Sequence, residues 1–183
     1  MPGWGPGAGI PTLYHRAAQH RALRSLYPLW RDLCHASPDI ALLPPGSRLA
    51  DTLAVRDLGF RLYRRIVEIR DGSLALRPYV DARIAEDARA RCRAAGLSNE
   101  ETDVVVEAAN LAAALRAKAK GRPAGRTVIL PVTCAGADVM SEVAVLERLA
   151  RCYTRSPIVR AVVAGWEREE IDRAGHVGRL VGR

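Results

Sequence analysis

An amphipathic pattern in residues 55–71 constrains the fold of this chain more than any other feature. Apolar side chains recur there every three or four residues, at Val55, Leu58, Leu62, Ile66 and Ile69. This spacing places them on one face of an α-helix, because a half-buried strand would alternate apolar and polar residues. Most of the intervening residues are charged, which is typical of a solvated opposite face. Such a helix needs other elements to cover its apolar face, and the rest of the chain must supply them.

Start and stop signals predict further helices along the chain. Pro28 can open a short helix, and Gly72 is a plausible C-terminal stop for the amphipathic one, although the chain could continue past it. Ser98 and Glu101 have the spacing of a capping box, and Asp138 and Ser156 are further candidate N-caps. The predicted helices cover residues 13–26, 29–36, 55–71, 81–95, 98–119, 138–153 and 156–174.

The sum of these signals is an all-α protein, an irregular bundle of five to seven helices. A length of 183 residues suits one domain. Residues 1–12 are expected to form a disordered leader because they are rich in glycine and proline. A single helical domain would span residues 13–174, with a loop at 120–137, followed by a frayed tail at 175–183. No apolar run approaches the roughly 18 residues of a spanning helix.

The net charge of +8 is distributed along the whole chain. Of the 28 basic residues 26 are arginine, and most of them have an acidic residue close by in the sequence. A nucleic-acid-binding face normally concentrates its positive charge, so this distribution argues against one.

One stretch is basic without compensation in the sequence. No acidic residue lies between Glu107 and Asp138, and the stretch contains Arg116, Lys118, Lys120, Arg122 and Arg126. A flexible basic loop can contact an anionic membrane surface or the phosphates of a nucleic acid. It can equally be a solvated linker, and the sequence leaves these alternatives open.

Metal and cofactor sites are not predicted. The four cysteines are far apart and form no short-spaced pair, so free thiols in a reducing compartment are expected rather than a zinc site. The histidines do not share a helix face at ligand spacing. Asp103 and Glu107 do share a face and could hold Mg²⁺, but acids near the start of a helix also complement its dipole. The cofactor prediction is therefore none.

Three segments together resemble a known family. The central one is Arg61–Tyr79, RLYRRIVEIRDGSLALRPY; upstream lies LYPLWRDL at 26–33, and downstream EAANLAAALR at 107–116. They are similar to a domain of unknown function common in actinobacteria, and the resemblance covers roughly residues 13–165. Members are multi-pass membrane proteins classed with transporters, in which this domain is the cytosolic C-terminal part.

The resemblance implies a cytosolic helical module held beside a membrane, and it supplies no catalytic residues. The membrane helices of the family have no counterpart in this sequence. The chain is therefore expected to be a free-standing version, a fragment, or the soluble portion alone, and transport cannot be assigned to it.

The central segment also provides the candidate contact face. Its charged residues are expected on the outer arc of the helix and just beyond its end: Arg61, Arg64, Arg65, Glu68, Arg70, Asp71 and Arg77. They could form a structural ion-pair network. They could also receive an anionic partner, because guanidinium groups outnumber carboxylates.

The first functional hypothesis is a non-catalytic interaction or regulatory module, located in the cytoplasm or at the inner face of the cell membrane. Its expected partner is a protein, such as a multi-pass membrane protein, with peripheral contact to an anionic membrane surface. The alternative is an enzyme acting on a phosphorylated or otherwise anionic small molecule in an inter-helix pocket where these arginines would meet Asp103 and Glu107. Weak nucleic-acid binding is the third hypothesis.

Overall fold

A computed structural model describes residues 9–40, 58–125 and 139–181, with side chains from residue 15 to residue 173. Over these ranges the chain forms six α-helices and no strand, which confirms the predicted all-α bundle. The helices are α1 (Gly9–Ala36), α3 (Leu58–Ala75), α4 (Ala82–Ala94), α5 (Asn99–Ala119), α6 (Val139–Arg155) and α7 (Pro157–Val181). Short 3₁₀ turns follow α1 (η1, Pro38–Ile40) and α3 (η2, Arg77–Tyr79).

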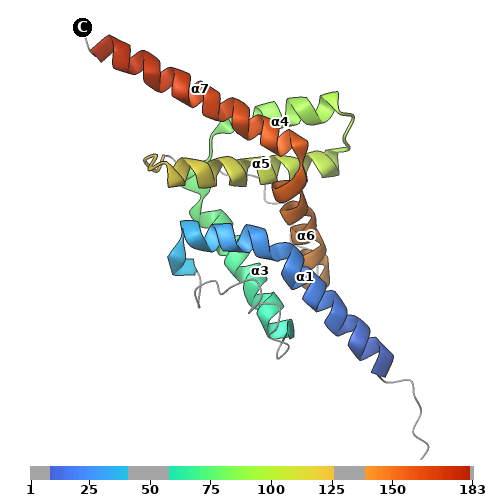
Figure 1. Cartoon of the computed structure of the whole chain (residues 1–183). Helices are drawn as coiled ribbons and strands as arrows, with labels where there is room; N and C mark the ends of the chain where they lie inside the picture. Colours follow the sequence, from blue (N-terminus) through green and yellow to red (C-terminus); the bar gives the residue numbers. More distant parts are fainter. Residues whose placement is uncertain (1–8, 41–57, 126–138, 182–183) are drawn as a thin grey trace, which may run out of the picture.

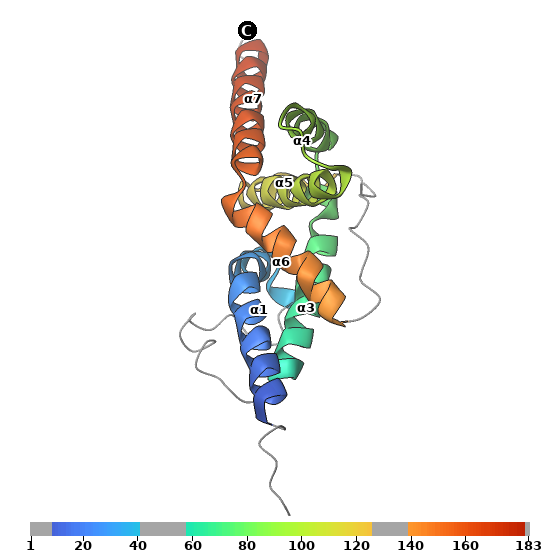
Figure 2. The same cartoon turned by 90° about the vertical axis from the view of Figure 1, so that its right-hand side faces the viewer.

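Helix α5 is the centre of the arrangement. It packs against α4, α6 and α7, and more lightly against α1 and η2. Helices α1 and α3 form the lower half of the molecule in Figure 1, with α4, α5 and α7 above them. Helix α6 runs from one half to the other, as the rotated view in Figure 2 also shows. Two layers of helices thus pack on each other, and α6 contacts both of them.

The burial of α5 is wider than a single apolar stripe. Its buried residues are Val104, Val105, Val106, Ala108, Ala109, Asn110, Leu111, Ala113, Ala114, Leu115 and Ala117. Consecutive buried positions show that partners cover the helix on several sides, as expected for a helix in the core of a domain. Many of these residues are alanine, which lets the neighbouring helices approach closely. The capping box is present, because Ser98 N donates to Glu101 Oε2 and Glu101 N donates to Ser98 Oγ.

Helix α1 is a single helix where two were expected. Pro28 lies inside it and cannot donate a backbone hydrogen bond. The helix changes direction along its length in Figure 1, as proline commonly causes. Leu26, Leu29 and Leu33 on either side of the proline are at most 1% exposed, so burial in the core favours one continuous helix. Its first turn also contains residues 9–12, which were expected in the leader.

Gly72 does not stop α3, which continues to Ala75. A Cβ atom at Gly72 would lie 2.8 Å from Ile40 Cδ1 and 3.0 Å from Leu33 Cβ. The glycine therefore permits a close crossing of α3 with α1 and η1. At the other end of the chain α7 extends to Val181, so the backbone of residues 175–181 is helical where a frayed tail was expected.

Several sequence predictions lie outside the described residues: the start of the amphipathic helix at Val55, the cap at Asp138, one of the four cysteines (Cys134), and Arg126 of the basic stretch. Within the described ranges, none of the helices combines the length and the apolar character that crossing a membrane requires.

Candidate functional site

Arg65 and Glu68 in the central segment are buried, and the expectation that they lie on the outer arc of the helix is wrong. Their exposed fractions are 5% and 3%. Glu68 accepts a hydrogen bond from Trp30 Nε1 at 2.7 Å and forms an ion pair with Arg64 Nη2 at 3.1 Å. Burying a carboxylate is costly unless donors surround it, and these two side chains supply donors. Glu68 therefore joins α3 to α1.

Arg65 makes a second link between the same helices. Its Nη1 donates to the carbonyl oxygen of Leu23 at 2.9 Å. The guanidinium carbon lies 4.0 Å from the centre of the Trp30 ring and 5.7 Å from that of Tyr27. Arginine stacks on aromatic faces in this way because it is planar and weakly hydrated.

Arg70 connects α3 to two further helices. Its Nε donates to Glu142 Oε1 of α6 at 2.7 Å, and its Nη1 lies 3.4 Å from Glu107 Oε1 of α5. Glu107 is thus engaged by an arginine, and Asp103 does not take part in this contact. No group of three or more possible metal-ligating side chains occurs in the part of the chain that the structure describes.

The structure thus brings Arg65, Glu68 and Arg70 into the contacts that join α3 to its neighbours, and Arg64 binds Glu68 from the same helix. Of the other three candidates, Arg61 and Arg77 are partly exposed and Asp71 is exposed. The geometry favours the structural interpretation of the central segment, because its buried charges hold helices together and do not face an open surface.

The basic stretch is not a loop over its first half. Arg116 and Lys118 lie in the last turns of α5, and Lys120 and Arg122 follow the helix. The expected lack of compensation is wrong for three of these cations, Arg116, Lys120 and Arg122, because acids from other parts of the fold approach them. Glu167 of α7 lies 3.2 Å from both Arg116 and Lys120.

Arg122 meets a second acid, Asp81, at 3.8 Å. Asp81 caps α4 and also accepts hydrogen bonds from Arg83 and from Trp166 Nε1. Burial alone would raise the pKa of Asp81, but the hydrogen bonds from Arg83 and Trp166 outweigh it and lower the pKa to about 2. The carboxylate therefore stays charged and ties α4, α7 and the turn after α5 together.

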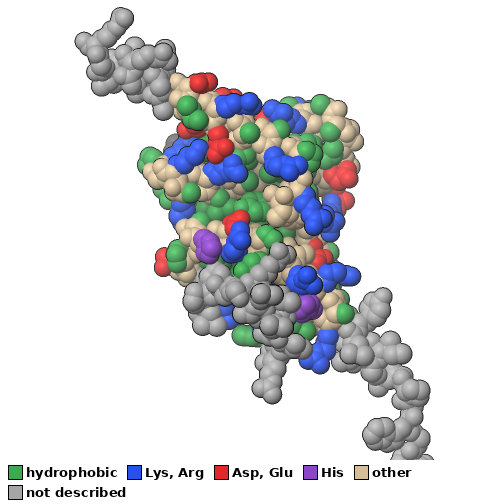
Figure 3. Space-filling model, in the orientation of Figure 1, with side chains coloured by type: hydrophobic (Ala, Val, Ile, Leu, Met, Phe, Trp, Pro, Cys, Tyr) green, Lys and Arg blue, Asp and Glu red, His purple; other side chains and the backbone are tan. Residues whose placement is uncertain are grey.

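The clearest recess in the described surface is a groove of about 770 Å³ between α1, α5, α6 and α7. Figure 3 shows hydrophobic side chains in a hollow between the upper and lower halves, with basic side chains around it. The apolar residues that line the groove are Ala36, Ala112, Leu115, Ala119, Val159 and Val163. Its polar lining consists of Asp32, His35, Arg116, Lys118, Tyr153, Thr154 and Arg160.

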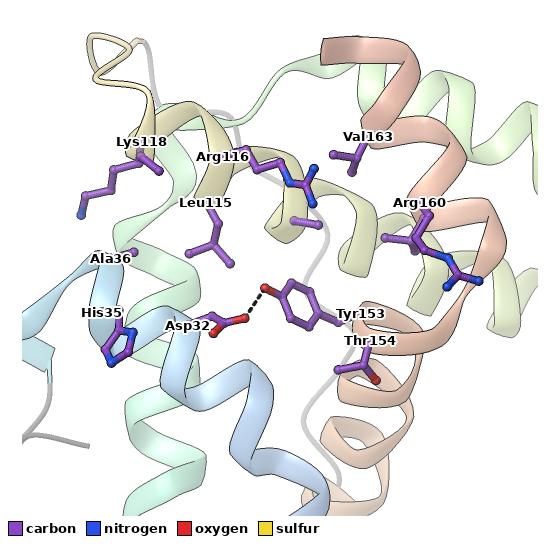
Figure 4. Close-up of a pocket in the computed structure, with 13 residues that line it drawn as sticks. Asp32, His35, Ala36, Leu115, Arg116, Lys118, Tyr153, Thr154, Arg160 and Val163 are labelled. Atoms are coloured by element: carbon purple, nitrogen blue, oxygen red, sulfur yellow. Dashed lines mark hydrogen bonds between the residues drawn. The ribbon is translucent and has the colours of Figure 1, made fainter. Parts of the chain in front are cut away.

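Tyr153 and Asp32 form a fixed pair in the groove. The phenol oxygen of Tyr153 donates to Asp32 Oδ2 at 2.8 Å, and Figure 4 shows the ring reaching from α6 toward α1. Arg31 binds the other oxygen of Asp32 at 2.7 Å. Burial and the negative charge of Asp32 raise the pKa of Tyr153 far above its usual range, so the phenol remains protonated. Asp32 already has two partners.

Two basic side chains of the groove, Lys118 and Arg160, lie at its opposite ends, and Arg116 lies between them, paired with Glu167. In Figure 4 Lys118 and His35 are at one end and Arg160 is at the other. Lys118 Nζ contacts the hydroxyl of Ser37 at 2.6 Å, and no carboxylate approaches it within the described residues. Arg160 is exposed at the start of α7 and forms no ion pair with any described acid. Because Arg31 pairs with Asp32, the net charge of the groove lining is positive.

Sequence reasoning identified Arg116 and Lys118 but missed Asp32, Tyr153 and Arg160 as members of one site. These three come from three helices, and Asp32 and Tyr153 are 121 residues apart. The one available signal was the segment at 26–33, which contains Asp32 and belongs to the resemblance.

A family model matches residues 15–156, which is most of the chain. The chain belongs to this family of unknown function (DUF6545). No curated protein and no solved structure matched the chain.

The DUF6545 match includes the Glu68 network and the Asp32–Tyr153 pair, but it ends just before α7. Arg160 and the two valines that α7 contributes to the groove lie beyond the matched residues. One wall of the groove is therefore built from a helix outside the matched region.

Proposed function

We propose that this chain is a non-catalytic interaction module that binds an acidic segment of a protein partner in the groove between α1, α5, α6 and α7. The observation that carries the proposal is the lining of the groove, in which an apolar floor lies between cations at both ends.

The charge of the groove selects an anionic group. Arg160 and Lys118 have no carboxylate partner among the described residues, and Asp32 is occupied by Arg31 and Tyr153. A carboxylate of a partner would therefore gain a charge-assisted hydrogen bond without displacing an existing ion pair.

The floor of the groove favours an apolar group of the ligand next to its anionic group. Leu115, Val159 and Val163 lie at the floor and are buried at the level of the core. A volume of about 770 Å³ falls within the roughly 300–1,000 Å³ of typical ligand sites. An aliphatic side chain flanked by aspartate or glutamate residues matches both features, and the groove is open at the surface to admit a peptide chain.

The groups in the groove suit binding better than proton transfer. Tyr153 is held as a neutral phenol, and Asp32 is held between two donors. A general base needs a pKa near the working pH and a free lone pair toward the substrate. This supports a binding role over the enzymatic alternative.

The partner and location that we propose follow from the resemblance and the charge. The family pattern at 61–79 supports a multi-pass membrane protein as the partner and the cytoplasmic side of an actinobacterial membrane as the location. The net charge of +8 supports an additional contact with an anionic membrane surface.

The proposal is tested with a fluorescein-labelled peptide of alternating aspartate and leucine residues, whose binding is followed by fluorescence anisotropy. We expect R160E and K118E each to weaken binding at least tenfold, and a peptide with lysine in place of aspartate to bind no better than background. R168E is the matched control, because Arg168 is an exposed arginine of the same helix outside the groove.

Two outcomes would overturn the proposal. Equal loss of binding in R160E and R168E would show a general charge effect and not a groove. Binding of a medium-chain alkyl phosphate at this site, with no peptide binding, would favour the second candidate, an anionic small molecule in an inter-helix pocket. The arginines of the central segment, Asp103 and Glu107 do not line this groove, so the convergence that would favour that candidate is not found there.

A further inference from the structure

The outer face of α3 carries a line of exposed apolar side chains. Phe60 is 65% exposed, Tyr63 55%, Val67 39% and Leu74 48%. Residues separated by three, four and seven positions lie above one another on a helix, so these four form one stripe along α3. The opposite face of α3 is already buried against α1. Helix α3 thus has two apolar faces, of which the described chain covers only one.

The spacing of the stripe indicates what kind of surface fits it. Positions 60, 63, 67, 70 and 74 follow the alternating three- and four-residue steps of a coiled-coil seam. Arg70 occupies one of these positions, and its guanidinium group forms ion pairs with Glu142 and Glu107. The stripe extends over residues 60–74, a length of about 21 Å along the helix. A second helix packed along α3 would cover it.

The charges beside the stripe are self-complementary. Arg64 and Asp71 lie on the same side of the stripe. Arg64 is three residues before Val67, and Asp71 is four residues after it. Asp71 is exposed and forms no ion pair with the described residues. If a second α3 runs antiparallel about an axis near Val67, each Arg64 comes opposite the Asp71 of the other copy. A parallel pair would place the two copies of each residue on opposite sides of the seam, so Arg64 and Asp71 would not meet.

We propose that two copies of this chain associate through an antiparallel pair of α3 helices centred on Val67. Phe60 of one copy then packs beside Leu74 of the other, and the two Arg64–Asp71 pairs flank the seam. The interface is closed and uses the same surface on both copies, as a two-fold dimer requires. Helix α3 lies at the edge of the lower half of the molecule in Figure 2.

The proposed interface is small. One helix pair buries less than the roughly 1,200 Å² of total surface at the lower limit of stable complexes. The dimer is therefore expected to form in a concentration-dependent way. This inference is independent of the groove, because no residue of the stripe lines the groove.

Cysteine cross-linking tests the geometry directly. V67C is expected to form a disulfide between two copies under mild oxidation, since Val67 lies next to its counterpart. A mixture of F60C and L74C chains should give the mixed 60–74 cross-link, identified by mass spectrometry of the linked peptides, and little 60–60 product. Predominant 60–60 and 74–74 products would overturn the antiparallel arrangement.

Sedimentation velocity over a concentration series tests whether the copies associate at all. V67E is expected to abolish the dimer, and D71R should raise its dissociation constant at least fivefold because it places two arginines opposite each other. E86R is the matched control, since Glu86 is an exposed acid on α4 away from the stripe. Circular dichroism checks that each variant is folded. A wild-type chain that stays monomeric at every concentration and gives no V67C cross-link would overturn the proposal.

Discussion

Glu68 shows how much of the fold one buried charge can decide. Its carboxylate accepts from Trp30 on α1 and from Arg64 on its own helix, and it is 3% exposed. A buried ion pair is weak evidence of net stabilisation, because desolvation offsets most of the attraction. Removing only one member, however, leaves a buried charge or a buried donor without its partner. The network therefore specifies how α1 and α3 fit together.

We expect E68A to lower the free energy of unfolding by roughly 3–5 kcal/mol, the usual effect of breaking a buried pair. E68Q should cost less, because its amide oxygen can still accept from Trp30 Nε1. Urea unfolding followed by circular dichroism measures both. An E68A variant as stable as the wild type would contradict the structural role of the network.

At the scale of the element, the crossing of α1 and α3 depends on a missing side chain. Gly72 lies where a Cβ atom would meet Ile40 and Leu33 at 3.0 Å or less. Glycine is a poor helix former, so its presence inside α3 has a cost of about 1 kcal/mol relative to alanine. The close contact between the helices explains why it is tolerated. Gly165 in α7 has no such contact, because no other side chain lies within 4 Å of the place that a Cβ atom would take.

This contrast gives a matched pair of substitutions. G72A is expected to destabilise the protein by about 1–3 kcal/mol through overpacking, in spite of the gain in helix propensity. G165A should stabilise it by roughly 0.5–1 kcal/mol, because there only the propensity changes. Thermal unfolding of both variants measures the difference. If G72A were stabilised as much as G165A, the close crossing of α1 and α3 would be wrong.

At the scale of the whole molecule, ion pairs distribute the positive charge over the contacts between helices. Glu167 serves two cations of the segment 116–122, and Asp81 serves Arg122 as well as Arg83. Exposed pairs of this kind contribute little individually. Asp81 differs because its side chain is 10% exposed and it accepts from Trp166 as well as from Arg83.

The lowered pKa of Asp81 predicts a dependence of stability on acid. Its pKa falls from 3.8 to about 2 on folding, so the stability it contributes is present above pH 4 and is lost as the pH falls toward 2. D81N keeps a good N-cap but has no carboxylate to titrate at this position. Between pH 6 and pH 2.5 we therefore expect D81N to lose on the order of 1–2 kcal/mol less of its free energy of unfolding than the wild type loses. Urea unfolding at pH 6, 4 and 2.5 measures it. If the free energy of unfolding fell equally with pH in the wild type and in D81N, the contribution of Asp81 would be refuted.

The sequence by itself determined the helical class and several helix boundaries. The helix start at Asp81 and the capping box of Ser98 with Glu101 were predicted correctly, because a helix N-terminus depends on residues within one turn. The prediction that Pro28 opens a separate helix was wrong because burial in the core favours one continuous helix. For Gly72 the sequence left open whether the helix stops or continues, and the close helix crossing accounts for a glycine inside α3.

Only the tertiary structure decided which charges are buried and where a groove opens. Glu68 looked like a residue of a solvated face, and its donor Trp30 is 38 residues away. The groove likewise joins Asp32 and Tyr153 across 121 residues, with Arg160 from the next helix. The backbone conformation of a residue depends mainly on its neighbours within one helical turn, whereas the environment of its side chain depends on which helices pack together. A sequence pattern therefore locates helices before it can locate their contacts.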